Sequence, residues 1–289
     1  MSIASRGGKL YVGGGGDDPN SCHRREDLLT SDVFGAYRYL PVQAGIGPLL
    51  AGAVDADDST LASWAAKHDV PWDTLSVAWF AFWPSLAGRE PDLVVVLGDA
   101  NGEAKLAVLV EVKLHAQQHF IEGLSQLGHY GLTFRDGELD DEPFDVALPP
   151  LRPVVYVTVG TECPTGELRA ARDEIGVSDS ARETGVFWTS WSAAAVCAED
   201  ARIERGKEDA AAHELALLDD LVADLAHRGF HRPRAIQSFP LPPLPTLGHY
   251  ALAAHGLRST KALAPRTFAD LDGLELPMLD GALRRWRMR

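Results

Sequence analysis

Two apolar runs in the first half of the chain predict a pair of neighbouring strands. Residues 93–97 read LVVVL, and residues 106–114 are apolar apart from Glu111 and Lys113. Both runs are rich in β-branched residues and too short to span a bilayer, which is typical of buried strands. Between them, residues 98–102 (GDANG) are turn formers. We therefore expect an antiparallel hairpin.

Hydrophobic spacing elsewhere predicts helices and further strands around this hairpin. An N-terminal helix is indicated by Leu29, Val33, Phe34 and Tyr37, which recur at helical intervals. Further helices are expected within 60–86 (with Leu75, Trp79 and Phe82 on them, interrupted by Pro71), around 126–130, over 192–197 and over 208–226, and strands over 154–159 and 185–189. This order predicts an α/β fold with a mixed central β-sheet flanked by helices.

The pattern also suggests three parts of the chain. We expect residues 1–20, with glycines at 13–16, to be a flexible N-terminal segment and residues 21–200 to form the core. Residues 201–289 are expected to be a helical and proline-rich extension packed on the core, because residues 239–245 contain four prolines and cannot form a regular helix.

Two charged side chains interrupt the second apolar run. Strand alternation sends Glu111 and Lys113 to the same face, opposite to the face of Val110 and Val112. Burying a charge without a partner is expensive, so a further charged group, a metal ion or water is expected nearby. In an antiparallel hairpin, Asp92 at the start of the first strand lies close to Glu111 at the end of the second. Two carboxylates that converge in this way suit Mg²⁺ or Mn²⁺.

The order of these residues resembles the PD-(D/E)XK phosphodiesterase superfamily. The signature is carried by Pro91 and Asp92, then by Glu111, Val112 and Lys113, and the helix that follows has a Gln-x-x-x-Tyr pattern, Gln126 to Tyr130, similar to RecB-type and lambda-exonuclease-like members. A spacing of four puts Gln126 and Tyr130 on one helical face. The resemblance covers residues 24–134 by motif.

The resemblance implies a restriction-endonuclease-like core and a metal-dependent nuclease, with a role in defence or DNA repair. Asp92 and Glu111 would bind Mg²⁺ or Mn²⁺, and Glu26 on the first helix would add a carboxylate. Lys113 would orient or activate the attacking water, and Gln126 and Tyr130 would position the substrate or Lys113. Metal is needed because it lowers the pKa of bound water and offsets the charge of the transition state.

Less specific interpretations remain open at this point. Glu111 and Lys113 could be an exposed strand pair, and Glu26 could be a surface acid, with Asp27 as its rival for the metal-binding position. His115 and His119 are four residues apart, but no further zinc ligands accompany them. The fold could also serve as a catalytically silent binding or regulatory subunit.

Composition is consistent with a globular cytoplasmic protein. The 289 residues are 46% hydrophobic and 24% charged, no run is long enough for a membrane helix, and residues 1–11 lack the apolar core of a signal peptide. The three cysteines (Cys22, Cys163 and Cys197) have no metal-binding spacing, and we interpret them as reduced and structural.

Charge is the feature least typical of a nucleic-acid enzyme. The formal net charge is -14, whereas binding to phosphates normally depends on Lys and Arg. DNA as the substrate therefore requires an uneven charge distribution or a partner that delivers the substrate. The chain could act as a homodimer or with a protein partner. Two basic clusters could hold phosphates or simply be solvated charges: Arg228, His231, Arg232 and Arg234 form one, and Arg284, Arg285, Arg287 and Arg289 form the other.

Overall fold

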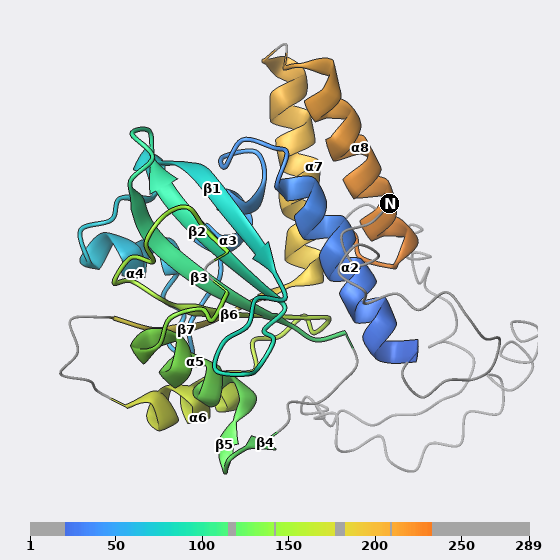
Figure 1. The fold of residues 1–289 in the computed structure, drawn as a ribbon. Coiled ribbons are helices and arrows are strands. Elements are labelled where there is room, and N and C mark those ends of the chain that lie inside the picture. Colours follow the sequence, from blue (N-terminus) through green and yellow to red (C-terminus); the bar gives the residue numbers. More distant parts are fainter. Residues whose placement is uncertain (1–20, 115–119, 142, 177–182, 209, 233–289) are drawn as a thin grey trace, which may run out of the picture. The chain divides into compact units, whose positions relative to one another are not determined.

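A five-stranded mixed β-sheet, covered by helices on both faces, forms the centre of the computed structural model (Figure 1). The structure describes residues 21–114, 120–141, 143–176, 183–208 and 210–232, with side chains from Glu26 onward. The strand order is β1-β2-β3-β6-β7. The strands are β1 (Leu75–Phe82), β2 (Leu93–Asp99), β3 (Ala104–Val112), β6 (Val154–Thr158) and β7 (Val186–Ser190). The predicted α/β class with a mixed sheet is confirmed.

The predicted hairpin is present as β2 and β3. The two strands are antiparallel, and Leu93 lies opposite Val110. The turn is closed by Asp99, whose Oδ1 accepts hydrogen bonds from the backbone N–H groups of Asn101 and Glu103. β3 ends at Val112, so Lys113 lies just past the end of the strand.

β1 corrects one of the predictions. The helical spacing assigned to Leu75, Trp79 and Phe82 was wrong, because residues 75–82 form a strand antiparallel to β2. A short run rich in apolar and aromatic residues fits either structure, and β2 supplies the backbone hydrogen bonds that decide between them. The Trp79 ring lies against Gly98 of β2, where an added Cβ would come within 2.8 Å of it. Upstream, α4 (Leu61–Lys67) is helical as expected, and Trp72–Thr74 is a single 3-10 turn.

β3, β6 and β7 are parallel neighbours in the sheet. Both faces of these strands are covered, which agrees with their nearly continuous apolar sequences. Lys113 N–H donates to the carbonyl oxygen of Val157 at 2.8 Å, so the pairing of β3 with β6 continues past the last residue of β3. The carboxyl ends of β3 and β6 therefore meet at one edge of the sheet.

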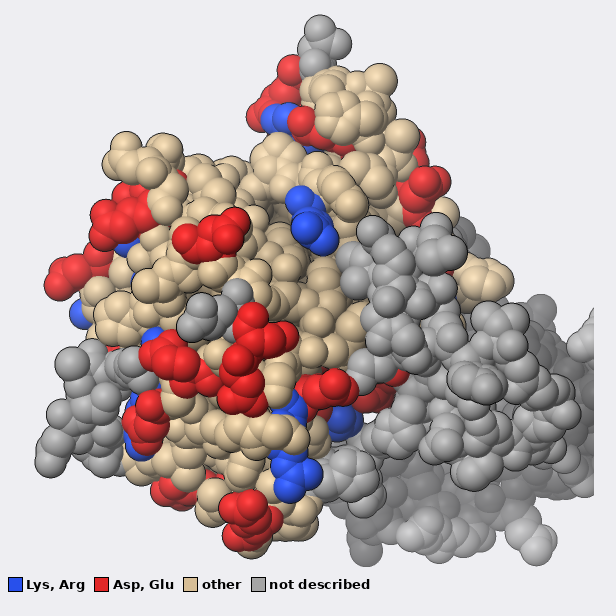
Figure 2. All heavy atoms as spheres, viewed as in Figure 1, with Lys and Arg blue, Asp and Glu red and all other residues tan. Residues whose placement is uncertain are grey.

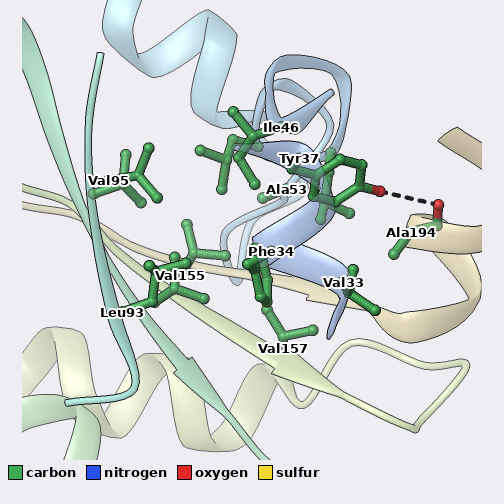
Figure 3. Close-up of a cluster of buried hydrophobic side chains, with 14 of the residues drawn as sticks. Val33, Phe34, Tyr37, Ile46, Ala53, Leu93, Val95, Val155, Val157 and Ala194 are labelled. Atoms are coloured by element: carbon green, nitrogen blue, oxygen red, sulfur yellow. Dashed lines mark hydrogen bonds between the residues drawn. The ribbon is translucent and has the colours of Figure 1, made fainter. Parts of the chain in front are cut away.

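The N-terminal helix α2 (Ser21–Tyr37) packs on the first face of the sheet. Phe34 lies over the valines and leucine of β2 and β6 shown in Figure 3. The Tyr37 hydroxyl donates to the carbonyl oxygen of Ala194 at 3.3 Å. The same face carries α3 (Ile46–Ala51), α4, α7 (Trp191–Lys207) and α8 (Ala212–His227). This packing fixes α2 with Glu26 near its N-terminal end, one requirement of the predicted site.

The opposite face is covered by α5 (Gln126–Asp136) and α6 (Thr165–Ile175). A short hairpin, β4 (Phe120–Ile121) and β5 (Leu124–Ser125), leads directly into α5. The two helices approach closely because α5 has glycines where it meets α6: a Cβ at Gly128 would come within 1.9 Å of Glu174, and one at Gly131 within 2.3 Å of Ile175. The small residues of α5 thus set the position of its N-terminal end.

We expect Gly131→Ala to lower the free energy of unfolding by about 1–3 kcal/mol, because the added methyl group overpacks the α5–α6 contact. Urea denaturation followed by circular dichroism would measure it. Gly166→Ala on α6 is the matched control, since an added Cβ there meets nothing within 4 Å. The control should be neutral or slightly stabilising through helix propensity. Equal effects from both substitutions would contradict the close-packing interpretation.

The helices after β7 differ in their bounds from the prediction. α7 extends to Lys207, well beyond the expected 192–197, and α8 replaces the expected 208–226 with 212–227. The predicted apolar stripe of α8 is confirmed at Leu218, Leu221 and Leu225, all of which are buried. The chain divides into one compact unit, Met1–Arg234, and a second, Ala235–Arg289. The expected N-terminal segment 1–20 and the proline-rich residues 239–245 lie outside the described residues.

None of the described helices is both long enough and apolar enough to cross a membrane. Cys163 and Cys197 are free thiols and are partly buried, while the side chain of Cys22 lies outside the described part of the chain.

Candidate active site

The adjacent ends of β2 and β3 bring two carboxylates together. The register that pairs Leu93 with Val110 continues outward to place Asp92 beside Glu111. Asp92 Oδ2 accepts a hydrogen bond from the backbone N–H of Val112 at 2.8 Å, which ties the start of one strand to the end of the other. Asp92 is half-buried and Glu111 is only 2% exposed. The convergence predicted from the hairpin is confirmed.

Lys113 lies among the carboxylates and is itself buried. Its Nζ is 2.6 Å from Oε1 of Glu111 and 3.5 Å from Oε1 of Glu26. This contact shows that Glu111 and Lys113 project to the same side, as the alternation predicted, and it rejects the exposed-pair interpretation, because both residues are at most 8% exposed.

Glu26 reaches the site from α2. Its Oε2 accepts a hydrogen bond from the backbone N–H of Leu114 at 2.8 Å, and its other oxygen approaches Lys113. Of the two neighbouring acids considered from the sequence, Glu26 contacts Lys113. Glu26 therefore links α2, on the first face of the sheet, to the end of β3.

α5 supplies the remaining predicted residues. Gln126 is the first residue of the helix, and its Nε2 donates to Glu111 Oε1 at 2.6 Å. Tyr130 follows one turn later and is buried on the same helix face. Burial, and then the nearby Glu111 carboxylate, raise the pKa of Tyr130 to about 12. Its hydroxyl therefore keeps its proton at neutral pH.

The position of Gln126 depends on residues that the sequence did not single out. Ser125 caps α5, because its Oγ accepts a hydrogen bond from Gly128 N–H at 3.0 Å. Ser125 in turn donates from its N–H and its hydroxyl to the carboxylate of Glu174 on α6. A serine before a predicted helix is a recognisable N-cap, whereas no local signal links it to an acid 49 residues away. Glu174 thus positions the start of α5 from a distance.

Negative charge is in excess at this site. Three carboxylates, of Asp92, Glu111 and Glu26, surround one ammonium group, that of Lys113. Burial, followed by the Glu111 charge, raises the pKa of Asp92 well above its ordinary value. Burial raises the pKa of Glu111 to about 6 even though Lys113 opposes the shift. Burial alone would lower the pKa of Lys113, but Glu111 and Asp92 outweigh it and raise that pKa.

The side chains suit a hard divalent cation in kind, since all the available ligands are carboxylate oxygens. In the described parts of the chain, however, no three or more His, Cys, Asp or Glu side chains are arranged as a group that could hold a metal ion. The Lys113 ammonium group contacts Glu111 at 2.6 Å and Glu26 at 3.5 Å, so the chain itself supplies a positive charge to these two carboxylates.

A cavity of about 270 Å³ adjoins Lys113 at the carboxyl ends of β3 and β6. Its lining includes Leu114, Tyr156, Val159 and Pro164, with Glu162 and Glu167 at the rim. The sequence had identified residues 154–159 only as a core strand. The cavity could have been anticipated from the rule that α/β sheets bind ligands beyond the carboxyl ends of their strands.

The first of the two predicted basic clusters, around Arg228 and Arg232, forms ion pairs. Arg228, at the end of α8, bonds to Asp32 and Asp224, and Arg232 bonds to Glu199 and Asp200. These contacts favour the interpretation as a charge cluster at a helix end over that of a phosphate-binding groove. The second cluster, 284–289, lies outside the described residues, as do Arg234 and the two histidines at 115 and 119.

We expect Asp92→Asn to raise the free energy of unfolding in EDTA, on the order of 1–2 kcal/mol, because it removes one of the excess buried charges while Asn can still accept from Val112 N–H. Asp99→Asn, at the other end of β2, is the matched control. The backbone N–H of Glu103, foremost among its contacts, lowers the pKa of Asp99, so its charge is stabilising and the substitution should destabilise. Urea unfolding of both variants should show opposite signs; the same sign would refute the charge excess.

A comparison of the chain with protein families, curated proteins and solved structures finds no match.

Proposed function

We propose that this protein is a metal-dependent nuclease that hydrolyses phosphodiester bonds, with DNA as the expected substrate. The observation that carries the proposal is the cluster of three carboxylates around Lys113, of which those of Glu26 and Glu111 are buried. A site that serves only packing would balance its charges, because each uncompensated buried charge is costly. Here the excess negative charge matches what a divalent cation would neutralise.

Two further observations support the proposal. The residues of the cluster are those that the PD-(D/E)XK resemblance names, and they come from four separate segments of the chain. The order of helix, three antiparallel strands, helix and parallel strand agrees with the restriction-endonuclease-like core that the resemblance implies. A short motif can match by chance, and a chance match gives no reason for its residues to lie together in the fold.

In the proposed reaction, Asp92 and Glu111 would hold Mg²⁺ or Mn²⁺, with Glu26 as a third carboxylate. The ion would lower the pKa of its bound water and offset charge on the phosphate. Gln126 fixes the Glu111 carboxylate through its 2.6 Å hydrogen bond. Lys113 would orient the attacking water with its ammonium group. Tyr130 keeps its proton and can donate to a phosphate oxygen.

The test is a cleavage assay on linear, circular and single-stranded DNA, and on RNA, with Mg²⁺, Mn²⁺ or EDTA. The proposal expects cutting with either metal and none in EDTA. Comparison of circular with linear substrates separates internal cleavage from digestion at ends. Absence of cutting on all substrates, at metal concentrations up to about tenfold above cellular Mg²⁺, would overturn the enzymatic proposal.

A second candidate is a nuclease-fold subunit that binds without catalysis. It is favoured by one observation, the Lys113 ammonium group between Glu111 and Glu26, which neutralises part of the cluster without any metal. In this case the protein would bind nucleic acid or a protein partner equally well in EDTA and in Mg²⁺. Calorimetric titration with Mg²⁺ would then show no binding that depends on Asp92.

A further inference from the structure

Phe120, at the start of β4, is the most exposed large hydrophobic side chain among the described residues, with 80% of its surface accessible. Single exposed apolar residues are common, so position decides whether one matters. Phe120 pairs with Ser125 across the β4–β5 hairpin, and Ser125 precedes Gln126. Paired Cα atoms lie about 5 Å apart and consecutive ones about 3.8 Å, so the Cα atoms of Phe120 and Gln126 are within about 9 Å. Gln126 contacts Glu111 directly.

The hairpin that carries Phe120 is short and supported at its base. Its two turn residues, Glu122 and Gly123, both have positive φ values, 53° and 86°, as in the tight turns that match the twist of paired strands. At the other end, Ser125 is held by the carboxylate of Glu174. The hairpin projects from the layer formed by α5 and α6 (Figure 1). Phe120 is therefore presented to solvent from a defined place beside the site.

The charged side chains of the described residues are unsuited to binding a duplex by its phosphates. On the face shown in Figure 2, acidic side chains predominate over basic ones. Most of the described Lys and Arg side chains form ion pairs with carboxylates: Lys105, Lys113, Arg135, Arg152, Arg169, Arg172, Arg202, Arg205, Lys207, Arg228 and Arg232. Binding of duplex DNA depends strongly on Lys and Arg contacts to phosphates.

The cavity beside Lys113 combines apolar and aromatic residues with charged ones. Leu114, Tyr156, Val159 and Pro164 contribute its apolar surface, next to Glu162 and Glu167. Val159 is another of the exposed large hydrophobic residues, at 36%. Aromatic and apolar surfaces of this kind contact the faces of unpaired bases, which a duplex conceals.

We propose that the site acts on single-stranded nucleic acid and that Phe120 stacks on an unpaired base next to the bond to be cut. The inference rests on the proposed function, because it names the substrate of that same site. Stacking on an aromatic ring is tolerant of sequence and adds affinity without a further phosphate contact. It would offset part of the repulsion between an acidic surface and a polyanion.

Binding in EDTA tests the inference separately from catalysis. The full-length protein is titrated into a single-stranded 16-mer containing 2-aminopurine, in DNA and in RNA form, and into the corresponding DNA duplex. We expect the single strand to bind at least about 10-fold more tightly than the duplex, with quenching of 2-aminopurine fluorescence by stacking. Phe120→Ala should weaken single-strand binding about 10-fold and abolish the quenching, whereas Phe120→Trp should retain both.

The matched control is Tyr39→Ala, which removes another exposed aromatic side chain that is 60% accessible. Tyr39 follows the C-terminal end of α2, whereas Glu26 lies near the N-terminal end. It should bind as the wild type does. Equal affinity for single strand and duplex, or unchanged single-strand binding by Phe120→Ala, would overturn the inference. Neither result depends on cleavage, so a protein that stacks the base but never cuts would refute the proposed function alone. With Mg²⁺, Phe120→Ala should raise KM for the single strand and leave kcat unchanged.

Discussion

Glu111→Gln should reduce Mg²⁺-dependent cleavage by about 10³-fold or more. Under the proposed function Glu111 binds the metal ion, so loss of its negative charge weakens metal binding and reduces the stabilisation of charge in the transition state. Glutamine keeps the shape of the side chain and an oxygen that can accept from Gln126. The fold should therefore persist, which circular dichroism would verify. Initial rates over a Mg²⁺ titration would separate weaker metal binding from slower chemistry.

Glu103→Gln is the matched control, because Glu103 is an exposed acid at the far end of the same β2–β3 hairpin, where it pairs with Lys105. Its activity should equal that of the wild type. If Glu111→Gln and Glu103→Gln cleave equally fast, Glu111 has no part in catalysis and the metal-dependent proposal is wrong.

Lys113→Met should destabilise the protein in EDTA by about 3 kcal/mol, because it leaves buried carboxylates without their cation. The expected loss is smaller in saturating Mg²⁺, where the metal ion would replace the missing charge. The deficit should also shrink as the pH falls towards about 6, the raised pKa of Glu111 in the protein that has Lys113. Loss of the cation raises that pKa further, and a protonated carboxyl group needs no cation beside it.

Urea unfolding at two pH values, with EDTA and with Mg²⁺, measures these effects. Lys105→Met is the control, since Lys105 forms ion pairs at the surface and such pairs contribute little to stability. A Lys113→Met protein that is as stable as Lys105→Met in EDTA would show that the ammonium group is not needed to balance the cluster.

The sequence was sufficient to predict the centre of the fold. Apolar runs with a turn between them specified the β2–β3 hairpin, and a period of two then placed Asp92, Glu111 and Lys113 together. β1 was mistaken for a helix because aromatic residues such as Trp79 recur at intervals that fit both structures. Only pairing with β2, a contact between separate segments, resolves that ambiguity.

The support of the site could not be predicted in the same way. Glu174 holds the start of α5 from 49 residues away, and the contact of Glu26 with Leu114 spans 88 residues. Hydrophobic periodicity reports which face of an element is buried, but it carries no information about which distant polar atom meets it. The resemblance could name Glu26, but only the fold shows that its carboxylate contacts Lys113 and Leu114.

Lys113 gives the carboxylates of Glu26 and Glu111 a countercharge that belongs to the chain itself. Such a chain can fold and remain folded without a divalent cation, and a chelator should leave it native. Under the proposed function, a divalent cation would compete with the Lys113 ammonium group for the Glu111 carboxylate. The fraction of protein with bound metal would therefore rise and fall with the concentration of divalent cations. Cleavage would stop when that concentration is low and would resume when it rises.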